Sequence, residues 1–272
     1  MPELSILLPM LALLLAIGAF AGVIAGLLGV GGGLILVPAY YYAFEVLGYE
    51  SPALMRVCLA TSLATIIVTS LRSVHAHHGK SAVDLGILRG WGLWIALGAV
   101  AGVLVASSLR STVLQAIFGG VGVLVGLYMA FGRANWRLGE AMPDGPKRAA
   151  IGGSVGFLSV LMGIGGGTFG VPLMSLYSVP IHRAVATAAG FGVIIALPSA
   201  AIFLLTPVDV APPWTVGAVN LPAFAVTIAM TLITAPLGVR LAHAMDPGPL
   251  KRVFAVFIMI VALNMLRKAA GY

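Results

Sequence analysis

The sequence predicts an all-α, polytopic membrane protein built from two repeats that lie inverted in the bilayer. The first observation is composition: 60% of the residues are hydrophobic and only 8% are charged, whereas soluble domains carry roughly 25% charged residues. So few polar residues cannot cover the surface of a soluble fold. The second observation is a motif, G-x-G-G-G-x-x-x-V-P, that occurs at Gly29–Pro38 and again at Gly163–Pro172. Each copy interrupts an apolar helical stretch, so each half carries one broken helix.

The first element along the chain is an apolar run, Leu4–Leu28. It has neither a basic n-region nor a small-residue cleavage site, so we expect a retained helix rather than a signal peptide. The run continues through the first motif to about Leu47, long enough for a hairpin that crosses more fully than its counterpart. That counterpart, Ala149–Val179, has 31 residues, about 46 Å as one helix, too long for one span and too short for two. It predicts a helical hairpin with its glycines inside the protein.

Six further apolar runs are long enough to cross the roughly 30 Å hydrocarbon core as helices. They lie near Pro52–Val74, Val83–Ser107, Val113–Phe131, Ala184–Leu205, Val216–Leu241 and Leu250–Leu266. The longest polar connector, Gly132–Lys147, contains a turn-forming Pro-Asp-Gly-Pro sequence. It divides the chain into a first membrane repeat (1–132), a connecting loop (133–147) and a second membrane repeat (148–272).

Two observations predict that the repeats are inverted. A hairpin plus three crossings gives each half an odd number of crossings, so the second half begins on the opposite side from the first. The loops also exchange charge: Arg72–Lys80 is basic, whereas its counterpart, Thr206–Trp214, carries only Asp209. The halves superpose at shifts of 134 residues for the glycine motifs, 126 for Ala60-Thr61 on Ala186-Thr187, and 136 for Asp84 on Asn220.

These motifs carry a family resemblance. The paired glycine motifs, the Ala-Thr in the next helix of each half, and Gly-x-Val-Asn-Leu-Pro at Gly217–Pro222 together resemble the TauE/SafE family of sulfite-exporter-like membrane proteins. The resemblance extends from Ala21 to about Leu266. It implies a transporter that moves sulfite, thiosulfate, sulfoacetate or another small sulfur-containing anion across a bacterial inner membrane.

The glycines of both motifs are the first candidates for a binding site. Consecutive glycines allow positive φ and close backbone approach, so they release the helix, and the half-helix that restarts exposes N–H groups at the positive end of its dipole. Such an end binds anions. The alternative is that the glycines only let helices pack closely. We favour the binding site, because an interrupted backbone must be satisfied at membrane depth. The candidates are Gly31, Gly32, Gly33, Gly165, Gly166 and Gly167.

Hydroxyl and amide donors form the second group of candidates. Thr61 and Thr65 share a helix face, Ser62 adjoins Thr61, and Thr187 matches Thr61 in the second half. Asn220, which we expect within the penultimate helix, adds a side-chain amide. The alternative for the threonines is that each hydroxyl donates to the carbonyl four residues earlier.

Arg56 and Arg183 are the cationic candidates, because each lies just ahead of the second helix of its half and a guanidinium matches an oxyanion bidentately. The alternative is that both are interfacial anchors. His75, His77 and His78 do not predict a metal site, because i and i+2 do not share a helix face and the cluster contains no carboxylate. We expect a hydrated basic loop there.

The remaining ionisable side chains argue against an enzyme. All eight carboxylates are expected in loops or at helix ends, so none is placed to relay protons at mid-membrane, although sodium coupling through backbone carbonyls stays open. They are Glu3, Glu45, Glu50, Asp84, Glu140, Asp144, Asp209 and Asp246. Cys58 is predicted as a small core residue, and Tyr40, Tyr41 and Tyr42 as an interfacial aromatic belt. We expect no catalytic residues, cofactor, metal or nucleic-acid partner.

The sequence thus predicts a multi-pass protein of the bacterial inner membrane, surrounded by lipid. It would export a small sulfur-containing anion, sulfite or an organosulfonate, by alternating access between the two repeats. Two rivals stay open: a passive anion channel, and a membrane scaffold subunit that transports nothing. The exact anion, the coupling ion and the oligomeric state are not predicted.

Overall fold

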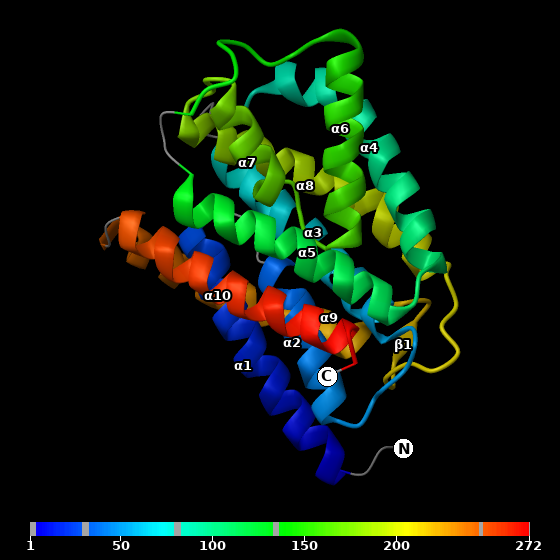
Figure 1. Ribbon diagram of the computed structural model, residues 1–272. Helices are drawn as coiled ribbons and strands as arrows, with labels where there is room; N and C mark the ends of the chain where they lie inside the picture. The colour runs from blue at the N-terminus through cyan, green and yellow to red at the C-terminus, as the bar shows by residue number, and fades with distance from the viewer. Residues whose placement is uncertain (1–3, 29–32, 79–82, 133–135, 245–246, 272) are drawn as a thin grey trace.

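The computed structural model describes residues 4–28, 33–78, 83–132, 136–244 and 247–271, which are almost entirely helical (Figure 1). The helices are α1 (Leu4–Leu28), α2 (Gly33–Val46), α3 (Leu54–His78), α4 (Leu85–Ser108), α5 (Ser111–Phe131), α6 (Gly145–Leu161), α7 (Gly167–Leu176), α8 (Ile181–Leu204), α9 (Leu221–Ala244) and α10 (Pro247–Ala269). Two short antiparallel strands, β1 (Thr215–Val216) and β2 (Val219–Asn220), precede α9. The all-α prediction is confirmed.

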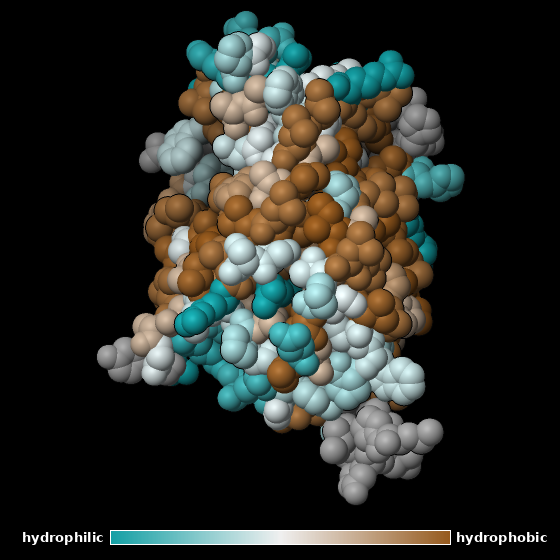
Figure 2. All heavy atoms as spheres, turned by 90° about the vertical axis from the view of Figure 1, so that its right-hand side faces the viewer, coloured by the Kyte–Doolittle hydropathy of each residue, from teal (hydrophilic) through white to brown (hydrophobic). Residues whose placement is uncertain are grey.

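The exterior of the helical bundle is apolar where a bilayer would contact it. Among the described residues, five helices are long and apolar enough to cross a membrane: Leu54–His75, Leu85–Ser108, Ser111–Phe131, Ile181–Leu204 and Leu221–Gly238. Figure 2 shows hydrophobic residues over the central part of one face, with hydrophilic residues gathered toward its two ends. Large side chains such as Leu93 of α4 and Leu124 of α5 are exposed, which suits lipid and not water. The prediction of a membrane protein is confirmed.

The second predicted hairpin is present. The chain leaves α6 at Leu161, turns through Gly163 with φ +61°, and becomes helical again at Gly167. The Leu138 backbone N–H donates to the Leu176 carbonyl at 2.7 Å, so α7 ends beside the loop that precedes α6. Helices α1 and α2 occupy the corresponding place in the first half, on either side of residues 29–32.

The expectation of a helix from Val216 is wrong for the first residues of that run. Thr215 pairs with Asn220 and Val216 with Val219, which makes a tight β-hairpin. Gly217 at its turn has φ +58°, a conformation that glycine adopts without strain. The apolar side chains of this run masked the turn, and α9 begins only at Leu221.

Each half packs its helices against the other half. Helix α1 lies against α9, α6 against α4, α3 against α8 and α5 against α10. Glycines make the close contacts: Gly18 of α1 faces Thr227 of α9, and Gly22, one turn later, faces Thr231. The order is the same along both helices, so α1 and α9 run in the same direction.

The same type of contact joins α4 and α6. Gly98 of α4 faces Gly153 of α6, and Gly102 faces Phe157, so these two helices also run in the same direction. Small residues allow such close approach in membranes. Helix α1 of the first half therefore packs on α9 of the second half. In the same way, α6 of the second half packs on α4 of the first.

Two ends of the bundle carry the loops (Figure 1). One end, which we call the hairpin end after the β-hairpin, holds β1 and β2, the loop 47–53 and the start of α5. The Ser111 N–H at this end donates to the Pro52 carbonyl at 2.8 Å. The opposite end, which we call the linker end, holds residues 136–144 and the starts of α4 and α6, where Arg148 approaches Gly90.

Candidate functional site

The two glycine motifs meet inside the bundle. A Cβ atom built on Gly33, the first residue of α2, would lie 2.8 Å from the carbonyl oxygen of Gly163 and 2.9 Å from the Cα of Ile164. Gly163 has φ +61°, and a Cβ atom there would lie 2.6 Å from Cγ2 of Val37. Both positions require glycine because backbone from one half touches backbone from the other. We call residues 163–167 the second glycine tip.

The other glycines of the second tip pack against α8 and α3. Gly166 has φ −63°, so the expectation of positive φ is wrong for it, and within the described part of this motif only Gly163 has one. A Cβ atom on Gly166 would lie 2.7 Å from the Ala188 carbonyl oxygen, and one on Gly165 would lie 3.2 Å from Ile66. Close packing, the alternative stated above, thus applies at Gly166.

Anion binding by these glycines stays a prediction. Gly167 begins α7 and is buried, and Gly166 precedes it with no side chain to cap the helix. Gly33 occupies the same place at the buried start of α2. Gly31 and Gly32 lie outside the described residues.

Thr61 and Asn220 come together from opposite halves. The Asn220 N–H donates to Thr61 Oγ1 at 3.0 Å, and Thr61 Oγ1 donates to the Val57 carbonyl at 2.7 Å. The Asn220 side chain accepts from the Ala223 N–H and donates to the Pro213 carbonyl, both at 3.0 Å. The prediction that Asn220 lies within a helix is therefore wrong: it caps the start of α9, and its amide is already engaged.

Thr187 and Asp84 repeat this arrangement with the halves exchanged. The Asp84 N–H donates to Thr187 Oγ1 at 2.9 Å, and Asp84 caps α4 by accepting from the Ile87 N–H at 3.0 Å. Arg183 pairs with Asp84 at 3.3 Å, with 55% of its side chain exposed. Each threonine thus accepts a hydrogen bond from the capping residue of the other half.

Ser62 connects α3 to the second glycine tip. Its hydroxyl donates to the Gly163 carbonyl at 2.7 Å, and both residues are buried. The hydroxyl of Thr65 donates to the Thr61 carbonyl at 2.9 Å. The bond from a hydroxyl to the carbonyl four residues earlier, proposed as the alternative for these threonines, is therefore present at both Thr61 and Thr65.

The two candidate arginines lie at opposite ends of the bundle. Arg56 donates to the Ser107 carbonyl at 2.8 Å, at the last turn of α4. Arg183 pairs with Asp84, just before the first turn of α4. A helix of this length spans about 36 Å, so the arginines do not converge on one anion. One stands near each end of the bundle, and the glycine tips lie inside it.

The predicted tyrosine belt is wrong at its first residue. Tyr40 is completely buried, whereas Tyr41 and Tyr42 are partly exposed. The Lys268 ammonium lies 5.4 Å from the ring centroid of Tyr41 and 5.0 Å from that of Tyr42, and it forms an ion pair with Glu45. The core position of Cys58 is confirmed. No local pattern predicts the burial of Tyr40, because three consecutive tyrosines match an interfacial pattern equally well.

Charged and metal-binding groups are sparse inside the described part of the bundle. No group of three or more metal-ligating side chains occurs among the described residues. His75 is exposed near the end of α3, and the side chains of His77 and His78 are outside the description. The carboxylates with described side chains lie at helix ends or in loops, with Glu45 next to the last residue of α2. Glu3 and Asp246 are also outside the description.

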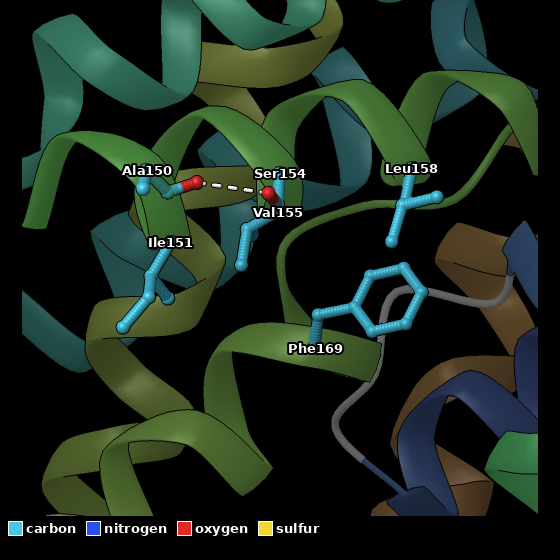
Figure 3. A pocket seen from close by; sticks show the side chains of 6 residues that line it. All are labelled: Ala150, Ile151, Ser154, Val155, Leu158 and Phe169. Carbon is cyan, nitrogen blue, oxygen red and sulfur yellow. Dashed lines mark hydrogen bonds between the residues drawn. The ribbon is translucent and has the colours of Figure 1, made fainter. Parts of the chain in front are cut away.

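An open groove lies between α6 and α7, but it does not provide the predicted anion-binding site (Figure 3). It has a volume of about 260 Å³ and is lined by Ala150, Ile151, Ser154, Val155, Leu158 and Phe169. Its one hydroxyl, that of Ser154, already donates to the Ala150 carbonyl at 2.8 Å, the dashed line in the figure. The groove therefore offers an anion no free donor.

Comparison with known proteins gives consistent matches along the chain. Residues 14–265 match the family described as sulfite exporter TauE/SafE. A probable membrane transporter protein of Haemophilus influenzae is 29% identical, covering 94% of this chain and 98% of its own. One of Methanocaldococcus jannaschii is 26% identical, covering 97% of both chains. The probable membrane transporter protein YunE of Bacillus subtilis is 28% identical over 64% of this chain and 71% of its own. No solved structure matches.

Proposed function

The chain belongs to the sulfite exporter TauE/SafE family of membrane transporters, and from that premise we propose that it exports a small sulfur-containing anion, sulfite or an organosulfonate, across the bacterial inner membrane. The observation that carries this proposal is the contact between the two broken helices. The start of α2 and the second glycine tip touch inside the bundle. Broken helices that meet at the interface of two halves are where transporters of this architecture bind substrate.

The anion would bind between the buried starts of α2 and α7. Unsatisfied N–H groups and the helix dipole favour negative charge at a helix start, and a water-excluded site strengthens both effects. A neutral backbone site also avoids a permanent charge at mid-membrane. Arg56 and Arg183, one near each end of the bundle, would attract the anion from either side rather than bind it at the centre.

Alternating access would follow from an inverted arrangement of the halves. Three observations support inversion: α1 lies on α9 as α6 lies on α4, Thr61 binds the cap of α9, and Thr187 binds the cap of α4. In each case exchanging the halves reproduces the contact. Helix α1 runs with α9 away from the hairpin end, and α6 runs with α4 away from the linker end. These directions support an arrangement in which the two halves start from opposite ends.

Charge supports an orientation with the linker end in the cytoplasm. Cytoplasmic loops carry an excess of lysine and arginine. The described helices and loops place Arg72, Arg89, Arg137, Lys147, Arg148, Arg183 and Arg240 at or near the linker end, against Arg56, Arg110, Arg267 and Lys268 at the hairpin end. The β-hairpin and the loop after α2 would then face the periplasm.

Transport of radiolabelled sulfite into proteoliposomes tests the proposal. A carrier gives uptake that saturates with sulfite concentration and accelerates when unlabelled sulfite is present on the opposite side. A passive channel gives flux that follows the gradient without such exchange. A scaffold subunit gives none above that of empty liposomes, and either of the last two results would overturn the proposal.

A further inference from the structure

A cluster of buried hydroxyls, contributed by α2 and α3 of the first half and α9 of the second, has no role in the site described so far. Tyr40 of α2, Thr65 of α3 and Thr227 of α9 are at most 1% exposed, and Thr231, one turn beyond Thr227, is 5% exposed. The Tyr40 hydroxyl lies beside those of Thr65 and Thr227. Within the described part of the chain, no hydrogen bond of good geometry reaches the hydroxyls of Tyr40, Thr227 or Thr231. A buried hydroxyl without a partner is costly, which points to a missing ligand.

The unbonded threonines differ from most helical hydroxyls of this protein. The usual bond runs from the hydroxyl to the carbonyl four residues earlier, as it does at Thr61, Thr65, Thr69, Ser107, Ser154, Ser199, Thr206 and Thr234. Thr227 and Thr231 do not make it. Their hydroxyl hydrogens, and that of Tyr40, are therefore not committed to a backbone carbonyl and can turn toward a neighbouring hydroxyl or a ligand.

Free donors select the sign of the ligand. A cation needs oxygens whose hydrogens are engaged elsewhere, as those of Thr61 and Thr65 are. An oxyanion needs the hydrogens themselves, and it presents several acceptor oxygens that can be shared among neighbouring hydroxyls. The cluster provides three hydroxyls on α2 and α9 whose hydrogens no backbone carbonyl accepts, which suits an oxyanion better than sodium.

The positions related to these by exchange of the two halves lack the hydroxyls. Using the shifts that superpose the halves, Tyr40 corresponds to Met174, Thr65 to Phe191 and Thr227 to Trp91. All three of these apolar side chains are buried, none more than 2% exposed. The polar cluster is therefore not a feature of the shared architecture but a difference between the halves, as a ligand bound off the pseudo-symmetry axis would require.

The cluster lies beside the meeting point of the glycine motifs. Ser62, one turn before Thr65 on α3, donates to the Gly163 carbonyl at 2.7 Å, and Val37, one turn before Tyr40 on α2, lies 2.6 Å from a Cβ atom built on Gly163. We propose that the hydroxyls of Tyr40, Thr227 and Thr231 bind the substrate oxyanion between α2 and α9, beside this meeting point, an inference that rests on the proposed function.

The test compares single variants that remove only a hydroxyl. Tyr40→Phe and Thr227→Val keep side-chain shape, and Thr234→Val is the matched control, because the Thr234 hydroxyl already donates to the Met230 carbonyl. Affinity for sulfite, added as the potassium salt, would be measured by calorimetry and by thermal melting of the purified protein. We expect each of the first two variants to weaken sulfite binding by about tenfold to a hundredfold, and the control to stay within about twofold. Without sulfite, neither should melt lower than the wild type, because the hydroxyl removed has no partner.

Three results would contradict the inference, and they are separable. Unaltered sulfite affinity in both folded variants, with wild-type transport intact, would mean that the cluster holds water only and would leave the proposed function standing. Stabilisation of the wild type by sodium chloride but not potassium chloride, lost in Thr227→Val, would identify a cation site. A wild type that neither binds nor transports sulfite or methanesulfonate would overturn the proposed function and this inference together.

Discussion

Replacing Gly166 with alanine tests the geometry of the second glycine tip most directly. The backbone of Gly166 has φ −63° and ψ −15°, which alanine adopts without strain. The obstacle is steric: the new Cβ atom would lie 2.7 Å from the Ala188 carbonyl oxygen and 2.8 Å from the Gly192 nitrogen. Both are main-chain atoms of α8, so no side-chain rotation relieves the overlap, and α7 must move away from α8.

The size of the effect follows from the cost of overpacking. Extra atoms forced into a packed core cost about 1–3 kcal/mol, and rigid backbone neighbours place Gly166→Ala at the upper part of that range. At roughly 2 °C per kcal/mol for chains of this size, the melting temperature should fall by about 5 °C. Gly153→Ala is the control: nothing lies within 4 Å of a Cβ atom at Gly153 in α6, so its melting temperature should not fall.

The assay measures melting and sulfite affinity on the same purified protein, so that the two roles of the tip separate. If the start of α7 binds the anion, the folded fraction of Gly166→Ala should also bind sulfite at least tenfold more weakly, because the N–H groups have shifted. A role in packing alone predicts lower stability with unaltered affinity. A Gly166→Ala protein that melts with the wild type and Gly153→Ala would refute the close contact between the tip and α8.

Three further outcomes are expected. Thr61→Val should lower the free energy of unfolding by about 1–3 kcal/mol, because it leaves a buried backbone N–H of the other half without its acceptor; denaturation of the detergent-solubilised protein measures this, and no change would remove the contact from the interface. On a Cys58→Ser background, a cysteine at Glu50 should react with an impermeant thiol reagent in intact cells and one at Asp144 only after permeabilisation; equal accessibility would contradict the inverted topology. Asp209→Asn should leave the response of uptake to a proton gradient unchanged in proteoliposomes. Loss of that response would show that the placement of Asp209 in a loop is wrong.

Local sequence patterns were sufficient for the helices and for the hairpin of the second half. An apolar run of about 20 residues specifies a span by its length, and Gly163 ends α6 because it takes a positive φ. The β-hairpin before α9 was missed for a related reason. Its turn glycine, Gly217, stands among apolar residues, and an apolar run does not by itself distinguish strand from helix.

Contacts between the halves could not be predicted in the same way. The alignment of the halves matched Thr61 with Thr187 and Asp84 with Asn220, but it did not show that each threonine binds the capping residue of the other half. Those hydrogen bonds join residues 159 and 103 positions apart, and they depend on how the halves are placed. The burial of Tyr40 is a similar case, because its hydroxyl lies beside that of Thr227 in the other half.

The differences between the halves bear on which end of the transporter is closed. Two identical inverted halves would give outward- and inward-open states of equal free energy, so any preference must come from residues that differ. At the hairpin end, Asn220 is fully buried. Its backbone N–H, its side-chain amide nitrogen and its side-chain oxygen each form a hydrogen bond within the protein. At the linker end, Asp84 occupies the equivalent position and pairs with a half-exposed Arg183. The Asp84–Arg183 ion pair is partly hydrated already, so it loses little when water enters the linker end. Opening the hairpin end breaks the buried hydrogen bonds of Asn220, which are satisfied in the closed state. If the halves are inverted repeats, as proposed, this difference predicts that the state closed at the hairpin end is the more stable of the two.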